Sequence, residues 1–315
     1  MSNYKTVFFI LGILQIILGV SMIFPIITQF IFEELDSSFI SASIITVIFG
    51  TLFLLSNFEN DRKLNLQHAF LLTSLSWISV AIFGSLPFIF SDLNLSVTDS
   101  FFESMSGITT TGSTIITDLN SAPKAILVWR AILQWLGGIG IIVMAITLMP
   151  IMNVGGMQLL KVSSSDASEK ILPKTKEITI RIIIIYLVLT FLCAFFYKIF
   201  GMKFFDSLTH SMTTIATGGF SNYNDSIGHF NNFKIEITSM IFIILGSIPF
   251  IAYIKYLSGK KNIFYTDTQI KSFIKIIFFS ILILFLYLTL FNKSFSTVSF
   301  RSVSFNVISI LTGTG

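Results

Sequence analysis

Seven apolar stretches, each long enough to cross a lipid bilayer as a helix, occupy most of this 315-residue chain. They cover residues 6–31, 38–57, 67–90, 125–150, 178–200, 235–257 and 272–291. About 20 apolar residues in a helix span the hydrocarbon core of a bilayer, so each stretch predicts one transmembrane α-helix. Only 11% of the residues are charged, against roughly 25% in soluble chains. The sequence therefore predicts an all-α, polytopic membrane protein and excludes a soluble fold.

The basic residues predict how these helices are oriented. With the N-terminus in the cytoplasm, 13 of the 20 Lys and Arg residues fall on the cytoplasmic side and seven on the outer side. That distribution follows the positive-inside rule. The longest polar cytoplasmic segment, Lys161–Glu177, is expected to be a solvated loop. Because the charges lie in short loops between apolar runs, the net charge of +4 indicates orientation in a membrane rather than binding of nucleic acid.

A motif recurs in the connections on the predicted outer side. Asp99–Gly112 reads DSFFESMSGITTTG, Asp206–Gly219 reads DSLTHSMTTIATGG, and Ser302–Gly315 reads SVSFNVISILTGTG. In the first two segments, Asp-Ser, Ser-Met, an Ile and the final Gly match at one constant offset of 107 residues. Self-similarity at this period predicts a duplicated unit of helix, half-length helix, glycine turn and helix. A third such unit begins near the C-terminus.

The repeated unit has the features of a cation-conducting pore. Non-helical backbone at membrane depth is tolerated where it lines a water-filled path or is buried in protein, and glycine permits dihedral angles that turn successive carbonyl oxygens toward one axis. Rings of such oxygens replace the hydration shell of a cation, and the carboxyl end of the short helix carries a partial negative charge. The Thr hydroxyls either brace the loop or add oxygen ligands. We therefore predict a pore for a dehydrated monovalent cation.

Other classes of function find less support in the residues. An intramembrane enzyme needs paired Asp, Ser with His, or a His-rich metal motif, and the apolar stretches contain almost no ionisable side chains. A secondary transporter with inverted repeats is disfavoured because both complete units begin on the same side. His68, His210 and His229 are scattered, so a metal site is not expected, and the single Cys193 excludes a disulfide scaffold. We expect no enzymatic activity and no cofactor.

At these motifs the chain resembles the TrkH/TrkG/KtrB superfamily of bacterial potassium-uptake proteins, most closely its TrkH branch. The resemblance covers essentially the whole chain. Its most specific segments are Leu86-Pro-Phe, Thr98–Ser113, Trp129-Arg130, Gln134–Ile142, Val154–Gln158, Thr214–Ser221 and Ser226-Ile-Gly228. The family implies potassium-channel-like M1–P–M2 repeats, each a long helix, a short pore helix and a second long helix, around one pore. It also implies a location in the bacterial inner membrane.

The resemblance also implies a division of the chain and a set of ion ligands. An N-terminal helical hairpin would occupy residues 1–60, the first repeat 61–160, the second 161–262, and the first two helices of a third repeat 263–315. The filter glycines would be Gly112, Gly219 and Gly315. Potassium would be bound by carbonyl oxygens in three loops, which comprise Thr109, Thr110, Thr111 and Gly112; Ala216, Thr217, Gly218 and Gly219; and Thr312, Gly313, Thr314 and Gly315. The third loop departs from the first, because Gly313 stands where the first has Thr110.

Family members have four repeats, whereas the 315 residues contain no counterpart of the third M2 helix or the fourth repeat. We therefore expect these residues to be part of a longer protein and not to conduct potassium by themselves. As partners, the resemblance implies a second copy of the pore chain in a homodimer, membrane lipid, and a cytoplasmic TrkA-type nucleotide-binding subunit. A sodium-coupled or less selective KtrB-type transporter of monovalent cations is the alternative, because Thr-rich loops do not by themselves distinguish potassium from sodium.

A few single residues carry further expectations. Asp99 and Asp206 are predicted to cap the short helices, a role compatible with drawing cations to the outer mouth. Glu103 and His210 occupy equivalent places and are expected to pack behind the pore helices. Arg130 is expected to hydrogen-bond to carbonyls of the filter loops, although it could instead extend to the outer surface. The Gly137-Gly-Ile-Gly140 segment predicts close helix packing rather than a nucleotide site, and Gly155-Gly156 is expected to break the fourth helix.

Overall fold

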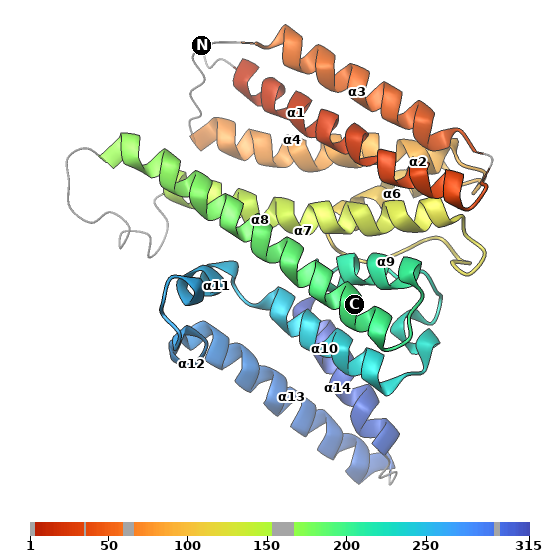
Figure 1. Ribbon diagram of the computed structural model, residues 1–315, viewed down its shortest axis with the longest axis vertical. Coiled ribbons are helices and arrows are strands. Elements are labelled where there is room, and N and C mark those ends of the chain that lie inside the picture. The colour runs from red at the N-terminus through yellow and green to blue at the C-terminus, as the bar shows by residue number, and fades with distance from the viewer. Residues whose placement is uncertain (1–3, 35, 59–65, 153–166, 293–296) are drawn as a thin grey trace.

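The computed structural model describes residues 4–34, 36–58, 66–152, 167–292 and 297–315. Within these ranges the chain is helical and contains no β-strand. The long helices run in roughly the same direction across the molecule in Figure 1. The N-terminal helices lie at the top of the view and the helix over residues 268–292 at the bottom, and the last helix leads back to the C-terminus in the middle. The predicted all-α architecture of a polytopic membrane protein is confirmed.

Most of the predicted transmembrane helices have direct counterparts. The described residues contain five helical segments long and apolar enough to cross a membrane, namely Lys5–Ile31, Ser38–Ser56, Gln67–Phe90, Glu177–Ile199 and Thr268–Leu290. The predicted stretch 125–150 corresponds to α7 (Lys124–Met152), a helix of 29 residues.

The predicted stretch 235–257 is not one straight helix. Here α10 (Phe233–Ser247) and α11 (Phe250–Leu257) meet at an angle of 84°. Pro249 stands between them, and proline cannot donate the main-chain hydrogen bond that would continue α10. Ile248, just before it, has the extended backbone that proline imposes on its neighbour. The apolar pattern identified the segment but not the break.

The first two membrane-spanning segments, Lys5–Ile31 and Ser38–Ser56, pack closely against each other. Helix α1 (Lys5–Ser21) leads into α2 (Ile23–Ile31), and α3 (Ser38–Ser56) lies along α1 at the top of Figure 1. A β-carbon added at Gly12 would lie 2.7 Å from the carbonyl oxygen of Gly50, and one added at Gly50 would lie 2.9 Å from that of Gly12. The two helices therefore approach each other through glycine, as small-residue packing in membranes requires.

Two units of long helix, short helix and long helix follow, with the start of a third. Helices α6 (Val97–Ile108) and α9 (Phe204–Ile215) have 12 residues each, which corresponds to about 18 Å, too short to span a hydrocarbon core of about 30 Å. The elements of the first unit are α4 (Leu66–Gly84), α5 (Leu86–Phe90), α6 (Val97–Ile108) and α7. Those of the second are α8 (Ala167–Ile199), α9 (Phe204–Ile215), η2 (Ser226–Phe230), α10 and α11. The third begins with α12 (Ile263–Thr266), α13 (Thr268–Asn292) and α14 (Thr297–Thr312).

Some predictions fall at or beyond the edge of the described residues. The predicted boundaries at 60/61 and 160/161, and the predicted break at Gly155-Gly156, lie outside them. The predicted boundary at 262/263 falls where α12 begins. The solvated loop predicted over Lys161–Glu177 is wrong from Ala167 onward, because α8 begins there and continues without interruption to Ile199. Polar composition alone does not distinguish a loop from an exposed helical turn.

Glycines hold the short helices against the long ones. Gly137 of α7 faces the carbonyl oxygen of Ile108 at the end of α6, and Gly246 of α10 faces the carbonyl oxygen of Ile215 at the end of α9. A β-carbon at either glycine would overlap or crowd that oxygen. Gly138 packs against Tyr186 of α8 and Ala216. The prediction that the Gly137–Gly140 segment serves helix packing is confirmed for its first two glycines.

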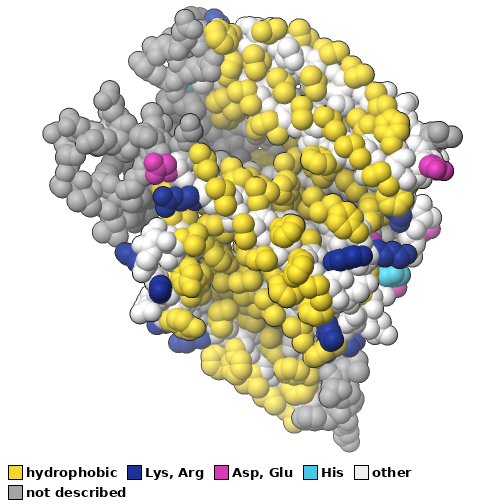
Figure 2. Space-filling model, in the orientation of Figure 1, with side chains coloured by type: hydrophobic (Ala, Val, Ile, Leu, Met, Phe, Trp, Pro, Cys, Tyr) yellow, Lys and Arg dark blue, Asp and Glu magenta, His cyan; other side chains and the backbone are white. Residues whose placement is uncertain are grey.

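The surface is suited to lipid. Figure 2 shows hydrophobic side chains over the middle of the visible face and most Lys and Arg side chains toward its two sides. Side chains of α13 such as Phe278, Ile283 and Leu290 are 61–75% exposed. Apolar exposure on this scale is costly in water and favourable against hydrocarbon, so these helices belong in a membrane.

We predict that Gly137→Ala destabilises the fold and that Gly140→Ala does not. The added methyl group at Gly137 has no room beside Ile108, whereas a β-carbon at Gly140 meets no atom within 4 Å. Overpacking typically costs about 1–3 kcal/mol, and replacing an unconstrained helical glycine by alanine gains up to about 1 kcal/mol. Thermal unfolding of the two purified variants in detergent checks this; equal melting temperatures would contradict it.

Candidate functional site

The three predicted filter loops share one backbone conformation. After α6, Thr110 and Gly112 have φ of 57° and 80°; after α9, Thr217 and Gly219 have 50° and 76°; after α14, Gly313 and Gly315 have 75° and 87°. This left-handed region is strained for residues other than glycine. Its occurrence at the same two alternate positions in all three loops confirms the alignment of the motifs.

Equivalent hydrogen bonds fold each loop back onto its short helix. The amides of Thr111, Gly218 and Thr314 donate to the carbonyl oxygens of Ser106, Thr213 and Ser309 at 2.9, 3.0 and 2.8 Å. The third loop thus has the same conformation as the other two, and the replacement of Thr110 by Gly313 does not alter it. Gly313 adopts this backbone without strain, whereas Thr110 and Thr217 adopt it at a cost that the surrounding contacts must offset.

The loops lie against one another. A β-carbon at Gly112 would overlap the carbonyl oxygen of Gly218, and a β-carbon at Gly219 would overlap that of Thr314. Glycine is therefore required at these two positions both by φ and by the approach of the neighbouring loop. The C-terminal residue lies beside α9 in Figure 1, which brings the third loop next to the second. Segments about 100 residues apart in the chain converge as the repeat predicts.

Threonine hydroxyls brace the first and third loops. The Oγ1 atoms of Thr109 and Thr111 lie 2.8 Å apart, as do those of Thr312 and Thr314. Thr109 Oγ1 also donates to the carbonyl oxygen of Met105 at 2.7 Å. The Thr hydroxyls were expected either to brace the loops or to act as ion ligands, and these hydrogen bonds correspond to bracing.

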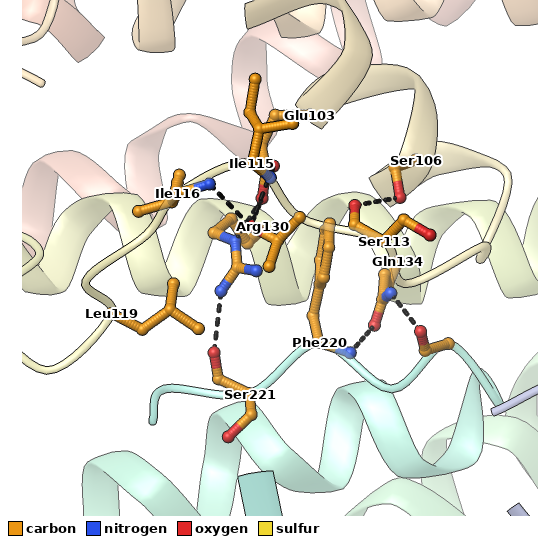
Figure 3. Close-up of polar contacts among 12 residues, drawn as sticks. Glu103, Ser106, Ser113, Ile115, Ile116, Leu119, Arg130, Gln134, Phe220 and Ser221 are labelled. Atoms are coloured by element: carbon orange, nitrogen blue, oxygen red, sulfur yellow. Dashed lines mark hydrogen bonds and ion pairs between the residues drawn. The ribbon is translucent and has the colours of Figure 1, made fainter. Parts of the chain in front are cut away.

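Glu103 supports the first loop from behind (Figure 3). Its carboxylate accepts hydrogen bonds from the Thr114 hydroxyl at 2.9 Å and from the Ile115 amide at 3.0 Å. The side chain is fully buried in α6. The expectation that Glu103 packs behind the pore helix is confirmed, and its polar contacts fix the segment Thr114–Ile115 that leaves the loop.

Arg130 of α7 links the first loop to the second. Its Nε donates to Glu103 at 2.7 Å in a buried ion pair, and its Nη1 donates to the carbonyl oxygen of Ser221 at 2.7 Å. The guanidinium also lies 4.0 Å from the centre of the Phe220 ring, a cation–π contact. The prediction that Arg130 binds loop carbonyls is confirmed, and extension to the outer surface is excluded because the residue is 1% exposed.

Gln134, one helical turn beyond Arg130, makes two hydrogen bonds to the second loop. Its Nε2 donates to the carbonyl oxygen of Gly218 at 2.6 Å, and its Oε1 accepts from the amide of Phe220 at 3.0 Å. The sequence alone assigned no contact to Gln134 and did not pair Glu103 with Arg130. A signal was present, because polar side chains four residues apart share a helix face and an intramembrane polar residue is a functional candidate by default.

The second loop is held by His210 and by residues on its outer side. His210 occupies the place of Glu103 and lies 3.0 Å from the Ser221 hydroxyl through Nε2. Asp206 accepts from Asn222 and from the Tyr223 hydroxyl, at 2.9 and 3.1 Å. Burial, together with the Asp206 charge, raises the pKa of Tyr223 to about 12, so this hydroxyl remains a donor at neutral pH.

In the third unit, the position that corresponds to Glu103 and His210 is occupied by Asn306. Its side-chain amide donates a hydrogen bond to the carbonyl oxygen of Ser302.

The predicted helix caps are wrong in detail. Ser96 is the N-terminal cap of α6 and its side chain accepts from the Asp99 amide at 3.1 Å, whereas Lys203 precedes α9 without a side-chain cap. Asp99 and Asp206 instead lie in the first turn, where a negative charge is still favoured by the helix dipole. The described residues contain no group of three or more His, Cys, Asp or Glu side chains that could hold a metal ion.

Comparison with known proteins identifies the class to which this arrangement belongs. Residues 35–311 match the TrkH family, described as cation transport proteins. The chain belongs to this family.

Its relatives carry the names of potassium transporters. The chain is 36% identical to the Trk system potassium uptake protein TrkI of Halomonas elongata, over 97% of this chain and 62% of the relative. It is 34% identical to the Trk system potassium uptake protein TrkH of Escherichia coli, over 99% and 66%. The crystal structure of the potassium transporter TrkH from Vibrio parahaemolyticus superposes with a TM-score of 0.89 at 32% identity, over 98% of this chain and 64% of that one. The chain thus spans just under two thirds of these relatives.

We predict that Glu103 and Arg130 are energetically coupled. Glu103→Gln or Arg130→Met alone leaves one buried group without its charged partner, and such a loss costs about 3–5 kcal/mol. The double variant is expected to lose less stability than the sum of the two single losses. A double-mutant cycle measured by thermal unfolding in detergent checks this, and additive losses would contradict it.

Proposed function

We propose that this chain forms the pore of a Trk-type system that takes up potassium across the bacterial inner membrane. The observation that carries the proposal is the convergence of three loops of one backbone conformation, each at the carboxyl end of a short helix. Each helix end presents a partial negative charge toward the loops. The printed names of the relatives support potassium as the transported ion.

In this proposal the ligands are main-chain carbonyl oxygens. Those of Thr109–Thr111, Ala216–Gly218 and Thr312–Thr314 replace the water around a potassium ion. Gly112, Gly219 and Gly315 permit the backbone to turn these oxygens inward. The hydroxyl contacts within the first and third loops then limit how far the oxygens can move.

The proposal includes an orientation in the membrane and two partner proteins. We place the N-terminus in the cytoplasm on the distribution of basic residues. A negative-inside potential then favours inward movement of a cation by about 2.3 kcal/mol per 100 mV. We propose a second pore chain and a cytoplasmic TrkA-type nucleotide-binding subunit as partners, since relatives are named as parts of a Trk system.

Uptake measurements test the proposal. The protein as its gene encodes it, with its accessory subunits, is expected to restore growth of a potassium-uptake-deficient bacterium at low potassium and to carry rubidium into cells. A protein that neither restores growth nor carries rubidium into cells would overturn the proposal. Equal uptake of sodium and potassium would instead favour the less selective KtrB-type alternative.

We predict that Gly219→Ala abolishes uptake and that Gly201→Ala preserves it. Both glycines have positive φ, 76° and 110°, so both substitutions introduce backbone strain of about 1–3 kcal/mol. Only the methyl group at residue 219 meets another loop, at Thr314, whereas a β-carbon at residue 201 meets no atom within 4 Å. Rubidium uptake at matched membrane levels checks this. Similar loss in both variants would show that strain, rather than the contact between loops, causes the defect.

A further inference from the structure

Gln134 is an uncharged polar side chain in the apolar helix α7, and it is fully buried. Burying an amide without hydrogen bonds is costly, so its contacts must compensate for its removal from water. Both of its functional atoms are used, and both bond to the backbone of one filter loop, at Gly218 and Phe220 (Figure 3).

The geometry of these two bonds constrains the residue between them. Gly218 offers its carbonyl oxygen and Phe220 its amide, so Gln134 pairs with the loop as a neighbouring β-strand would. Gly219 lies between the two bonds and has φ of 76°. The paired bonds therefore hold the left-handed residue of the loop in place and fix the direction of the adjoining carbonyl.

We propose that Gln134 is a positioning residue that sets the ion preference of the pore by holding the second filter loop. This inference rests on the proposed function. Gln134 touches the loop and not the transported ion, so it acts through the position of the Gly218 oxygen. That oxygen also lies against Gly112, so its position determines the spacing between the first and second loops.

Arg130 extends the same support by one helical turn. It bonds to the Ser221 carbonyl and to Glu103, and Phe220 lies against its guanidinium. A single face of α7 therefore binds the second loop at three main-chain groups and the first loop through Glu103. The relative position of two loops is set by one rigid helix.

The equivalent face of α10 has different residues. Gly137 and Gly246 occupy equivalent places against the ends of α6 and α9, which aligns Gln134 with Ile243 and Arg130 with Ser239. There the side chains leave a small cavity between the second and third loops, lined among others by His210, Thr213, Ser239, Ile243, Ser309 and Thr314. Ile243 has no amide to offer, so it provides a matched position without the contact.

Loss of the Gln134 bonds is expected to affect sodium and potassium differently. Discrimination between these ions depends on how many carbonyl oxygens surround the ion and how firmly they are held. Without its donor, the Gly218 oxygen is free to turn, and the loop can close around the smaller sodium ion. Loss of about 1.4 kcal/mol of discrimination, within the range for one buried hydrogen bond, is a tenfold change in preference.

The test compares three substitutions by methionine in the protein as its gene encodes it. Gln134→Met keeps the length of the side chain and removes both hydrogen bonds. Ile243→Met changes the equivalent position of α10, and Gln15→Met removes another fully buried glutamine, whose amide bonds to Ser79 at 2.6 Å in the N-terminal helices. Competitive uptake of rubidium and sodium in liposomes gives the ion preference, and thermal unfolding gives the stability of each variant.

We expect the preference for rubidium to fall about tenfold in Gln134→Met and to stay unchanged in both controls. An unchanged preference in a folded Gln134→Met protein, or an equal fall in Ile243→Met, overturns the inference. If Gln134→Met does not accumulate, Gln134→Glu is tested in its place. The Glu carboxylate cannot donate a hydrogen bond to the Gly218 oxygen, so this variant also loses that contact. A tenfold fall in the preference for rubidium supports the inference, and an unchanged preference overturns it. Wild-type protein that carries neither cation would overturn the proposed function, and this inference with it.

Discussion

The structure depends on one constraint, namely that main-chain polar groups at membrane depth must find partners within the protein. Three loops leave the helical conformation near the middle of the molecule, and their amides and carbonyls cannot be paired as in a helix. The amides are satisfied by bonds back to the short helices, such as those from Thr111, Gly218 and Thr314. We propose that a cation takes the place of the partners that the remaining loop carbonyl oxygens lack.

Close approach of backbone to backbone follows from this constraint. The loops can share one region only because glycine stands at Gly112 and Gly219, and the short helices reach it only because Gly137 and Gly246 admit their carboxyl ends. Buried polar side chains then hold the arrangement. Glu103 fixes the first loop, His210 the second, and Arg130 joins the two. Each of these side chains makes at least one hydrogen bond to the part that it supports.

Two features of the sequence predict most of the fold, namely the lengths of the apolar stretches and the internal repeat. The lengths of the apolar stretches locate the transmembrane helices, and the 107-residue offset aligns Gly112 with Gly219 from the sequence alone. The break at Pro249 was missed because hydropathy does not register backbone geometry, and the helix over residues 167–177 was missed because its composition is polar. The role of each filter carbonyl remains a prediction, whereas the convergence of the loops is confirmed.

The contacts of the side chains that support the loops, namely Glu103, Arg130 and Gln134, are harder to predict from the sequence than the helices are. Arg130 was placed correctly because the family that the chain resembles has Arg at this motif position. Its partner Glu103 and its neighbour Gln134 could not be assigned contacts. The Glu103 contact spans 27 residues and depends on how α7 lies against α6, and the Gln134 contact spans 84 residues and depends on how α7 lies against the loop after α9. Spacing within a helix shows which side chains share a face, but only tertiary packing shows what that face meets.

The position occupied by Glu103, His210 and Asn306 has a consequence for how such a pore can change. In a channel assembled from identical subunits, every substitution is copied around the ring and its effects are multiplied. Here the three equivalent positions are encoded separately, so a carboxylate, an imidazole and an amide coexist at corresponding places. In the proposed pore, each loop can therefore be altered by itself, and an asymmetric environment for the ion is accessible through single mutations.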